Sequence, residues 1–61
     1  MSTPIDAANE QRVQIEKIAT GVLARKAQVT NGEAIANITL AYRHLEDASM
    51  RLGRAIEALD K

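Results

Sequence analysis

The chain has 61 residues, of which 46 % are hydrophobic but only 2 % aromatic, and it contains no cysteine. This composition excludes a disulfide framework, a thiolate metal site and a cysteine nucleophile, while a chain this short buries only about 60 % of its surface when it folds alone. Eight basic residues balance eight acidic ones, and a neutral chain is a poor candidate for binding a nucleic-acid polymer. Association with other copies is the remaining way to gain stability.

Signals for membrane insertion or secretion are missing. No stretch approaches the roughly 18 apolar residues of a membrane span. The first residues, Met1 to Asp6, have neither the basic nor the apolar part of a secretion signal. We therefore expect an intracellular protein without a membrane-bound segment.

The first predicted helix covers residues 4 to about 28. Thr3 can cap it, Pro4 suits its first position, and the Asp6 carboxylate complements the positive end of the helix. Its apolar residues recur at helical spacing, so we expect them to form one buried stripe: Val13, Ile15, Ile18, Ala19, Val22, Leu23 and Val29.

A turn is predicted at about residues 29 to 32. Asn31-Gly32 is a strong turn signal. Thr30 and Glu33 have the spacing of a capping box, in which each side chain bonds the backbone of the other. This pair predicts a second helix that begins at about residue 33.

The second predicted helix, residues 33 to about 59, has the clearest pattern in the chain. Positions that alternate in steps of three and four are all apolar except Ser49, which is typical of a coiled-coil seam: Ile35, Ile38, Tyr42, Leu45, Ser49, Leu52, Ile56 and Leu59. A column of small residues runs beside this seam: Ala34, Ala41, Ala48 and Ala55. The apolar face is wider than one partner helix covers. We expect an all-α fold, a two-helix hairpin that assembles into an interlocked helical homo-oligomer; the alternative is a monomeric hairpin.

The polar face of the second helix has two interpretations. Arg43 and Asp47, and Asp47 and Arg51, are each four residues apart, so they can form surface ion pairs worth a few tenths of a kcal/mol. Alternatively, Arg43, Arg51 and Arg54 of several copies converge on a phosphate-bearing ligand, because guanidinium groups match phosphate oxygens. Sequence spacing alone leaves both open.

Nothing in the sequence assembles an enzyme active site. His44 stands alone, Ser49 lies on the seam without a base at a suitable spacing, and the adjacent Glu46 and Asp47 point to different sides. We therefore expect a protein that is not an enzyme, with no catalytic residue, cofactor or metal ion.

The segment from Asn37 to Ile56, and within it Leu45-Glu46-Asp47-Ala48-Ser49-Met50 followed by Ala55-Ile56, resembles the helix of a known family. These are the anti-CBASS and anti-Thoeris sponges, small helical-hairpin proteins of phages. The resemblance implies interlocked homo-oligomers, commonly hexamers, in the cytoplasm of the host. It further implies that they bind cyclic di- and trinucleotides or cyclic ADP-ribose isomers between chains. They sequester these immune signals without cleaving them, which blocks antiphage signalling.

The same resemblance implies which residues contact the ligand. They are Asn37, Arg43, Arg51 and Arg54, and we add Asp47, which lies among these arginines. Because aromatic residues are nearly absent, we expect the pocket to rely on phosphate contacts and on apolar side chains such as Leu40 and Met50. The rival interpretation is a structural coiled-coil oligomerisation module with no small-molecule ligand. A small nucleic-acid-binding dimer is disfavoured by the neutral charge.

Overall fold

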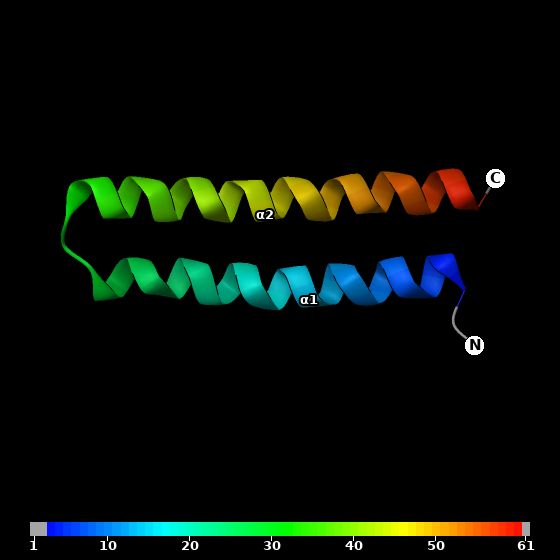
Figure 1. The fold of residues 1–61 in the computed structure, drawn as a ribbon, viewed down its shortest axis with the longest axis horizontal. Coiled ribbons are helices and arrows are strands. Elements are labelled where there is room, and N and C mark those ends of the chain that lie inside the picture. The colour runs from blue at the N-terminus through cyan, green and yellow to red at the C-terminus, as the bar shows by residue number, and fades with distance from the viewer. Residues whose placement is uncertain (1–2, 61) are drawn as a thin grey trace.

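The computed structural model describes residues 3–60, which form a helical hairpin (Figure 1). Helix α1 (Pro4–Arg25) continues into a short 3-10 turn, η1 (Lys26–Gln28), and a connection then leads to helix α2 (Gly32–Leu59). The two helices run antiparallel, so that both ends of the chain lie at the same end of the hairpin (Figure 1). The predicted all-α hairpin is confirmed, while its interlocking with other copies stays a prediction. Met1, Ser2 and Lys61 lie outside the described residues.

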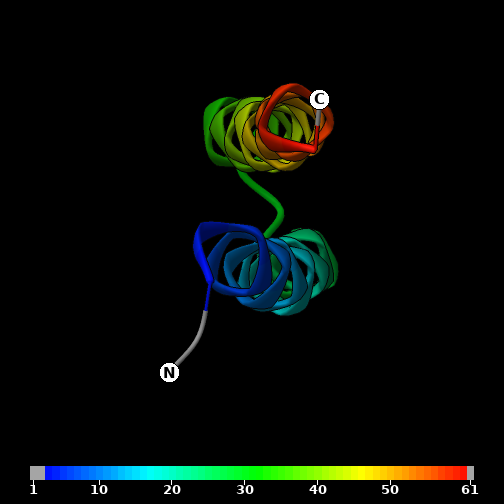
Figure 2. The same cartoon turned by 90° about the vertical axis from the view of Figure 1, so that its right-hand side faces the viewer.

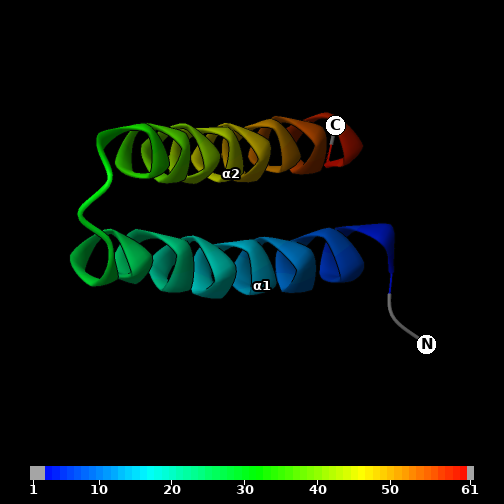
Figure 3. The ribbon, with the colours of Figure 1, turned by 60° about the vertical axis from the view of Figure 1, so that its left-hand side comes forward.

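The hairpin is a single layer of helices. Its principal extents are 46 × 19 × 10 Å. The end-on view of Figure 2 shows one helix above the other, and in Figure 3 they remain alongside each other over their whole length. A hydrophobic core ordinarily needs two packed layers. Among residues 3–60, only Ala8, Ala19 and Ser49 are buried. The molecule therefore has a seam between two helices rather than an enclosed core.

The start of α1 follows the sequence prediction. Thr3 Oγ1 accepts a hydrogen bond from the Asp6 backbone N–H at 3.1 Å, and Asp6 Oδ2 accepts one from the Thr3 N–H at 3.4 Å. This reciprocal pair is a capping box, and Pro4 occupies the first turn, where its missing N–H costs nothing. The predicted Thr3 cap is confirmed.

The face of α1 that packs against α2 differs from the predicted stripe. The least exposed positions alternate in steps of three and four and continue beyond the helix: Ile5, Ala8, Arg12, Ile15, Ala19, Val22, Lys26 and Val29. Val13, Ile18 and Leu23, predicted to be buried, are 54 %, 56 % and 41 % exposed. The prediction is wrong for these three because it followed apolar character and passed over Arg12 and Lys26. Long basic side chains can lay their aliphatic stems along an apolar seam.

The predicted seam of α2 is confirmed except at its end. Ser49 is buried, and the other seam residues are half-buried apart from Leu59, which is 53 % exposed near the C-terminal end of α2. In the alanine column, Ala34 and Ala48 are half-buried, whereas Ala41 and Ala55 are exposed. One partner helix therefore covers the seam but leaves part of the column uncovered.

The cap of α2 is Asn31 and not the predicted pair of Thr30 and Glu33. Asn31 Oδ1 accepts a hydrogen bond from the Ala34 N–H at 3.1 Å, and the helix begins at Gly32. The predicted capping box is therefore wrong by one position. Asparagine outranks threonine as a helix cap.

We expect Asn31→Ala to lower the free energy of unfolding by about 1 kcal/mol, because the Ala34 N–H loses its acceptor. Thr30→Ala, at an exposed position that does not cap, is the matched control and should change stability by less than about 0.5 kcal/mol. Urea unfolding at fixed protein concentration measures both. A larger loss of stability for Thr30→Ala than for Asn31→Ala would indicate that Thr30, and not Asn31, caps α2.

Candidate functional site

All five predicted ligand-binding residues lie on α2 with exposed side chains: Asn37, Arg43, Asp47, Arg51 and Arg54. None of them belongs to the seam. Helical spacing brings Asp47, Arg51 and Arg54 together on adjacent turns, with Arg43 one turn before Asp47. Asn37 is about 15 Å along the helix axis from Asp47, so one hairpin does not bring it to the same spot.

The arginines on α2 do not donate hydrogen bonds to other described residues. The side-chain hydrogen bonds formed within residues 3–60 do not include Arg43, Asp47, Arg51 or Arg54. The ion pairs that the spacing around Asp47 allows are therefore not formed between the described residues. By contrast, Asn37 Nδ2 donates to the Glu33 carbonyl oxygen at 3.0 Å, so its amide NH2 group already bonds to the backbone of α2.

The charge around these arginines is balanced within one chain. Three carboxylates lie in the same part of α2 as the three arginines, namely Glu46, Asp47 and Glu57. Exposed charges at such spacing are strongly screened by water. A single hairpin consequently offers separate guanidinium groups, and a strongly positive pocket requires arginines from more than one copy.

A cavity lies away from the predicted site, on one flank of the seam. It has a volume of about 280 Å³ and is lined by Asn9, Arg12, Val13, Glu16 and Ser49. Ser49, only 3 % exposed, donates from Oγ to Glu16 Oε1 at 3.0 Å. Ser49 therefore behaves as predicted, as a small polar residue within a helix interface, and the hydrogen bond compensates its burial.

Arg12 is the residue of this cavity that the predicted apolar stripe of the first helix leaves out. It is half-buried, and its Nε is buried without a hydrogen-bond partner. A Cβ atom added at Gly53 would lie 3.2 Å from Arg12 Nη1, so the glycine of α2 makes room for the guanidinium group. The three-four spacing through Ile5, Ala8 and Ile15 was the signal that places Arg12 on the seam.

We expect the effect of Gly53→Ala to depend on Arg12. In an Arg12→Ala background the substitution should stabilise the helix by up to about 1 kcal/mol, because alanine is the better helix former. With Arg12 present the gain should shrink, since the new methyl group crowds the guanidinium group. A double-mutant cycle by urea unfolding measures this coupling. Equal effects in both backgrounds would contradict the close approach.

The described residues show no arrangement for a metal ion. Within residues 3–60, no three His, Asp or Glu side chains are grouped in a way that would hold one. Nor does either described helix have the length and apolar character to cross a bilayer.

Comparison with known proteins gives no match: no family model, no curated protein and no solved structure is significantly similar to the chain.

Proposed function

We propose that this chain is a phage anti-defence sponge. Identical hairpins assemble, most simply as a hexamer, and hold cyclic di- or trinucleotides or cyclic ADP-ribose isomers at contacts between chains in the host cytoplasm. The ligand is sequestered without cleavage, so host immune effectors are not activated. The observation that carries this proposal is a set of exposed guanidinium groups, at Arg43, Arg51 and Arg54, that form no hydrogen bond with another described residue. Within residues 3–60 the hairpin also has almost no core.

Excess surface supports the assembly of several copies. The chain exposes 4809 Å², whereas a compact monomer of 6.6 kDa exposes about 3,900 Å². The excess of about 900 Å² is similar to what one partner buries in a standard protein interface, about 800 Å². Within residues 3–60, six large apolar side chains contribute to this uncovered surface: Val13, Ile18, Leu23, Leu40, Met50 and Leu59.

The chemistry of the arginines favours a phosphate-bearing ligand. A guanidinium group donates two parallel hydrogen bonds to phosphate oxygens, and such charge-assisted bonds are about twice as strong as neutral ones. In one hairpin the negative charges of Glu46, Asp47 and Glu57 balance those of the arginines. A positive pocket therefore needs arginines from more than one copy. Asp47 and Asn37 carry side-chain oxygen atoms that can accept hydrogen bonds from the donor groups of a base.

Sequestration acts by mass action and needs no catalysis. The free signal must fall below the concentration that activates the host effector, which requires abundant protein and tight binding. A dissociation constant of about 1 nM corresponds to about 12 kcal/mol. Several phosphate contacts together with burial of the bases at a contact between chains are of the right size to supply it.

The second candidate function is a structural coiled-coil oligomerisation module without a ligand. The regular seam of α2 and the balanced charges around its arginines favour it. In that case the arginines are solvated and serve solubility. Both functions share the homo-oligomer and differ in the ligand.

Native mass spectrometry with candidate ligands separates the two. The panel contains cyclic di- and trinucleotides and cyclic ADP-ribose isomers, with linear dinucleotides as controls. We expect an oligomer that gains the mass of a cyclic ligand, and the released ligand should be chemically unchanged. An intact oligomer that binds no member of the panel favours the structural module. A ligand released in cleaved form contradicts sequestration, and a well-folded monomer contradicts both functions.

A further inference from the structure

One flank of the hairpin combines a cavity with uncovered apolar side chains. We call this flank the cavity face and define it by the cavity lining together with Leu23 and Met50. Val13 and Met50 are 54 % and 60 % exposed, and Leu23 is 41 % exposed. Within residues 3–60, Val13 thus lines the hollow, and Leu23 and Met50 are two further exposed large apolar residues on the same flank.

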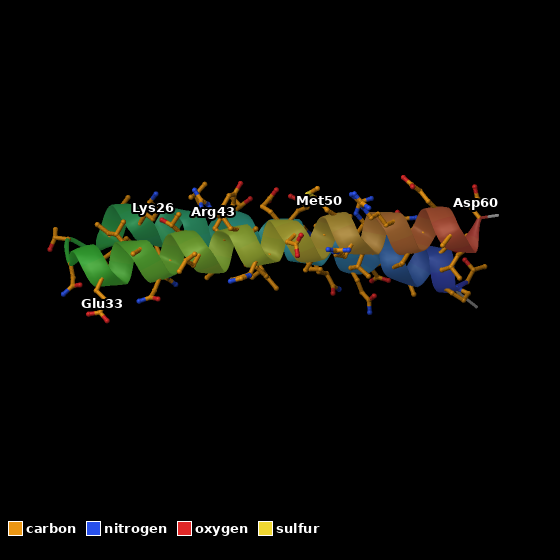
Figure 4. All side chains as sticks on the ribbon, turned by 90° about the horizontal axis from the view of Figure 1, so that it is seen from above. Lys26, Glu33, Arg43, Met50 and Asp60 are labelled. Carbon is orange, nitrogen blue, oxygen red and sulfur yellow. The ribbon has the colours of Figure 1, made fainter. Side chains whose placement is uncertain are left out.

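Helix geometry places these residues on the same side. On α1, Asn9, Glu16 and Leu23 follow one another at steps of seven, so they share one line along the helix. On α2, Met50 directly follows Ser49, which bonds to Glu16. Figure 4, seen from above, shows the side chains of Arg43 and Met50 along the same long edge of α2. Ser49 and Glu16, which are hydrogen-bonded to each other, both line the cavity.

The opposite flank is different in character. It carries the alanine column of α2, whose side chains are small. On α1, helical spacing places Ile18 and Val22 there, and of these two only Ile18 is largely exposed. Leu40 lies on the outer side of α2, away from α1, and Leu59 lies at the end of the helix. The cavity face is therefore the flank with the largest side chains to bury.

The exposed area and the flat shape of the hairpin indicate what covers the cavity face. The hairpin is one layer thick, with a shortest extent of 10 Å, and needs a second layer to enclose its apolar side chains. Its excess exposed area of about 900 Å² corresponds to one partner's share of a standard interface. A second hairpin provides a layer of the same length. A twofold contact also requires a surface that is complementary to itself, with a hollow and a protrusion on one face.

We infer that a second copy of this chain docks on the cavity face about a twofold axis, with Met50 of each copy seated at the cavity of the other. The flexible thioether side chain of methionine adapts to an irregular hollow. The second layer removes Val13 and Leu23 from water and brings polar groups of the other copy towards Arg12, whose Nε lacks a partner. The inference rests on the homo-oligomer of the proposed function but does not depend on its ligand.

Cross-linking of single-cysteine variants tests the inference directly. The chain has no cysteine, so Met50→Cys and Leu40→Cys each carry one thiol, at positions 60 % and 49 % exposed in the hairpin. With a short bis-maleimide at low protein concentration, we expect Met50→Cys to give covalent dimers in high yield and Leu40→Cys to give few. Efficient cross-linking through Leu40 with none through Met50 would overturn the inference.

A charge substitution gives a second, independent test. Met50→Lys should weaken association of the copies by about 10- to 100-fold, because a buried methionine is replaced by a charge. Leu40→Lys is the matched control and should leave association unchanged. Sedimentation velocity over a range of concentrations measures both, with helix content followed by circular dichroism. If Met50→Lys assembles as the unmodified chain does, the cavity face is not an interface. If assembly behaves as expected but no cyclic ligand binds, the ligand proposal fails while this inference stands.

Discussion

Leu52→Ala and Ile56→Ala are each expected to unfold the hairpin and abolish its assembly together. Both side chains lie on the seam of α2, where they are half-buried in the single hairpin. Truncating a leucine or isoleucine in a packed interface costs about 2 to 5 kcal/mol. A domain of this length rarely has more than about 3 to 5 kcal/mol of stability. Either substitution therefore removes most of what holds the helices together.

Two measurements on the same samples distinguish loss of the fold from loss of assembly. Circular dichroism reports helix content, and native mass spectrometry reports the number of copies. In Leu52→Ala and Ile56→Ala both should fall at the same protein concentration. Leu40→Ala is the matched control, because this leucine is 49 % exposed and lies off the seam. It should keep its helix content.

The outcome that contradicts this expectation is specific. If both seam variants remain helical and assembled with unchanged thermal melting, the seam of α2 is not the main contact of the protein. The apolar surface that stabilises it would then lie elsewhere, for example on the alanine column.

Arg51→Ala and Arg54→Ala are expected to weaken binding of the cyclic ligand by about 10- to 100-fold each, with almost no loss of stability. A hydrogen bond to a charged group contributes about 1.5 to 3 kcal/mol, which is the energy that corresponds to this factor. Both arginines are exposed and form no hydrogen bond with another described residue. Surface substitutions of this kind usually change the free energy of unfolding by less than about 0.5 kcal/mol.

Titration calorimetry with the ligand identified by native mass spectrometry measures the effect. Lys17→Ala is the control, since it removes one exposed positive charge from α1 without touching the arginines of α2. It should bind almost as well as the unmodified chain. Arg54→Lys should fall in between, because lysine keeps the charge but lacks the two-pronged donor geometry. Equal losses for Lys17→Ala and Arg54→Ala would indicate general charge attraction rather than a site at the arginines.

Much of the fold is readable from local chemistry. Thr3 and Pro4 identify the start of α1, and the three-four spacing from Ile35 to Ile56 identifies the packed face of α2. These signals depend on residues within one or two turns of each other. Local backbone hydrogen bonding and helical periodicity therefore suffice to read them.

The sequence was less informative about the partner face of α1. The apolar residues Val13 and Ile18 were expected on that face but are exposed. Arg12 and Lys26 occupy seam positions instead. A basic side chain in a seam is tolerated where the opposite helix leaves space, as Gly53 does for Arg12. That space depends on the register of two helices far apart in sequence, which no local pattern encodes.

The candidate ligand site has a similar division. The sequence by itself determined that the second helix carries three arginines and on which sides of the helix they lie, because the helical repeat fixes their spacing. Only the tertiary structure decided that they form no hydrogen bond with another residue of the described range 3–60, and that a cavity lies instead between α1 and α2 beside Ser49. The physical reason is that helix formation is governed by near neighbours, whereas burial and cavities arise from contacts between segments that only folding brings together.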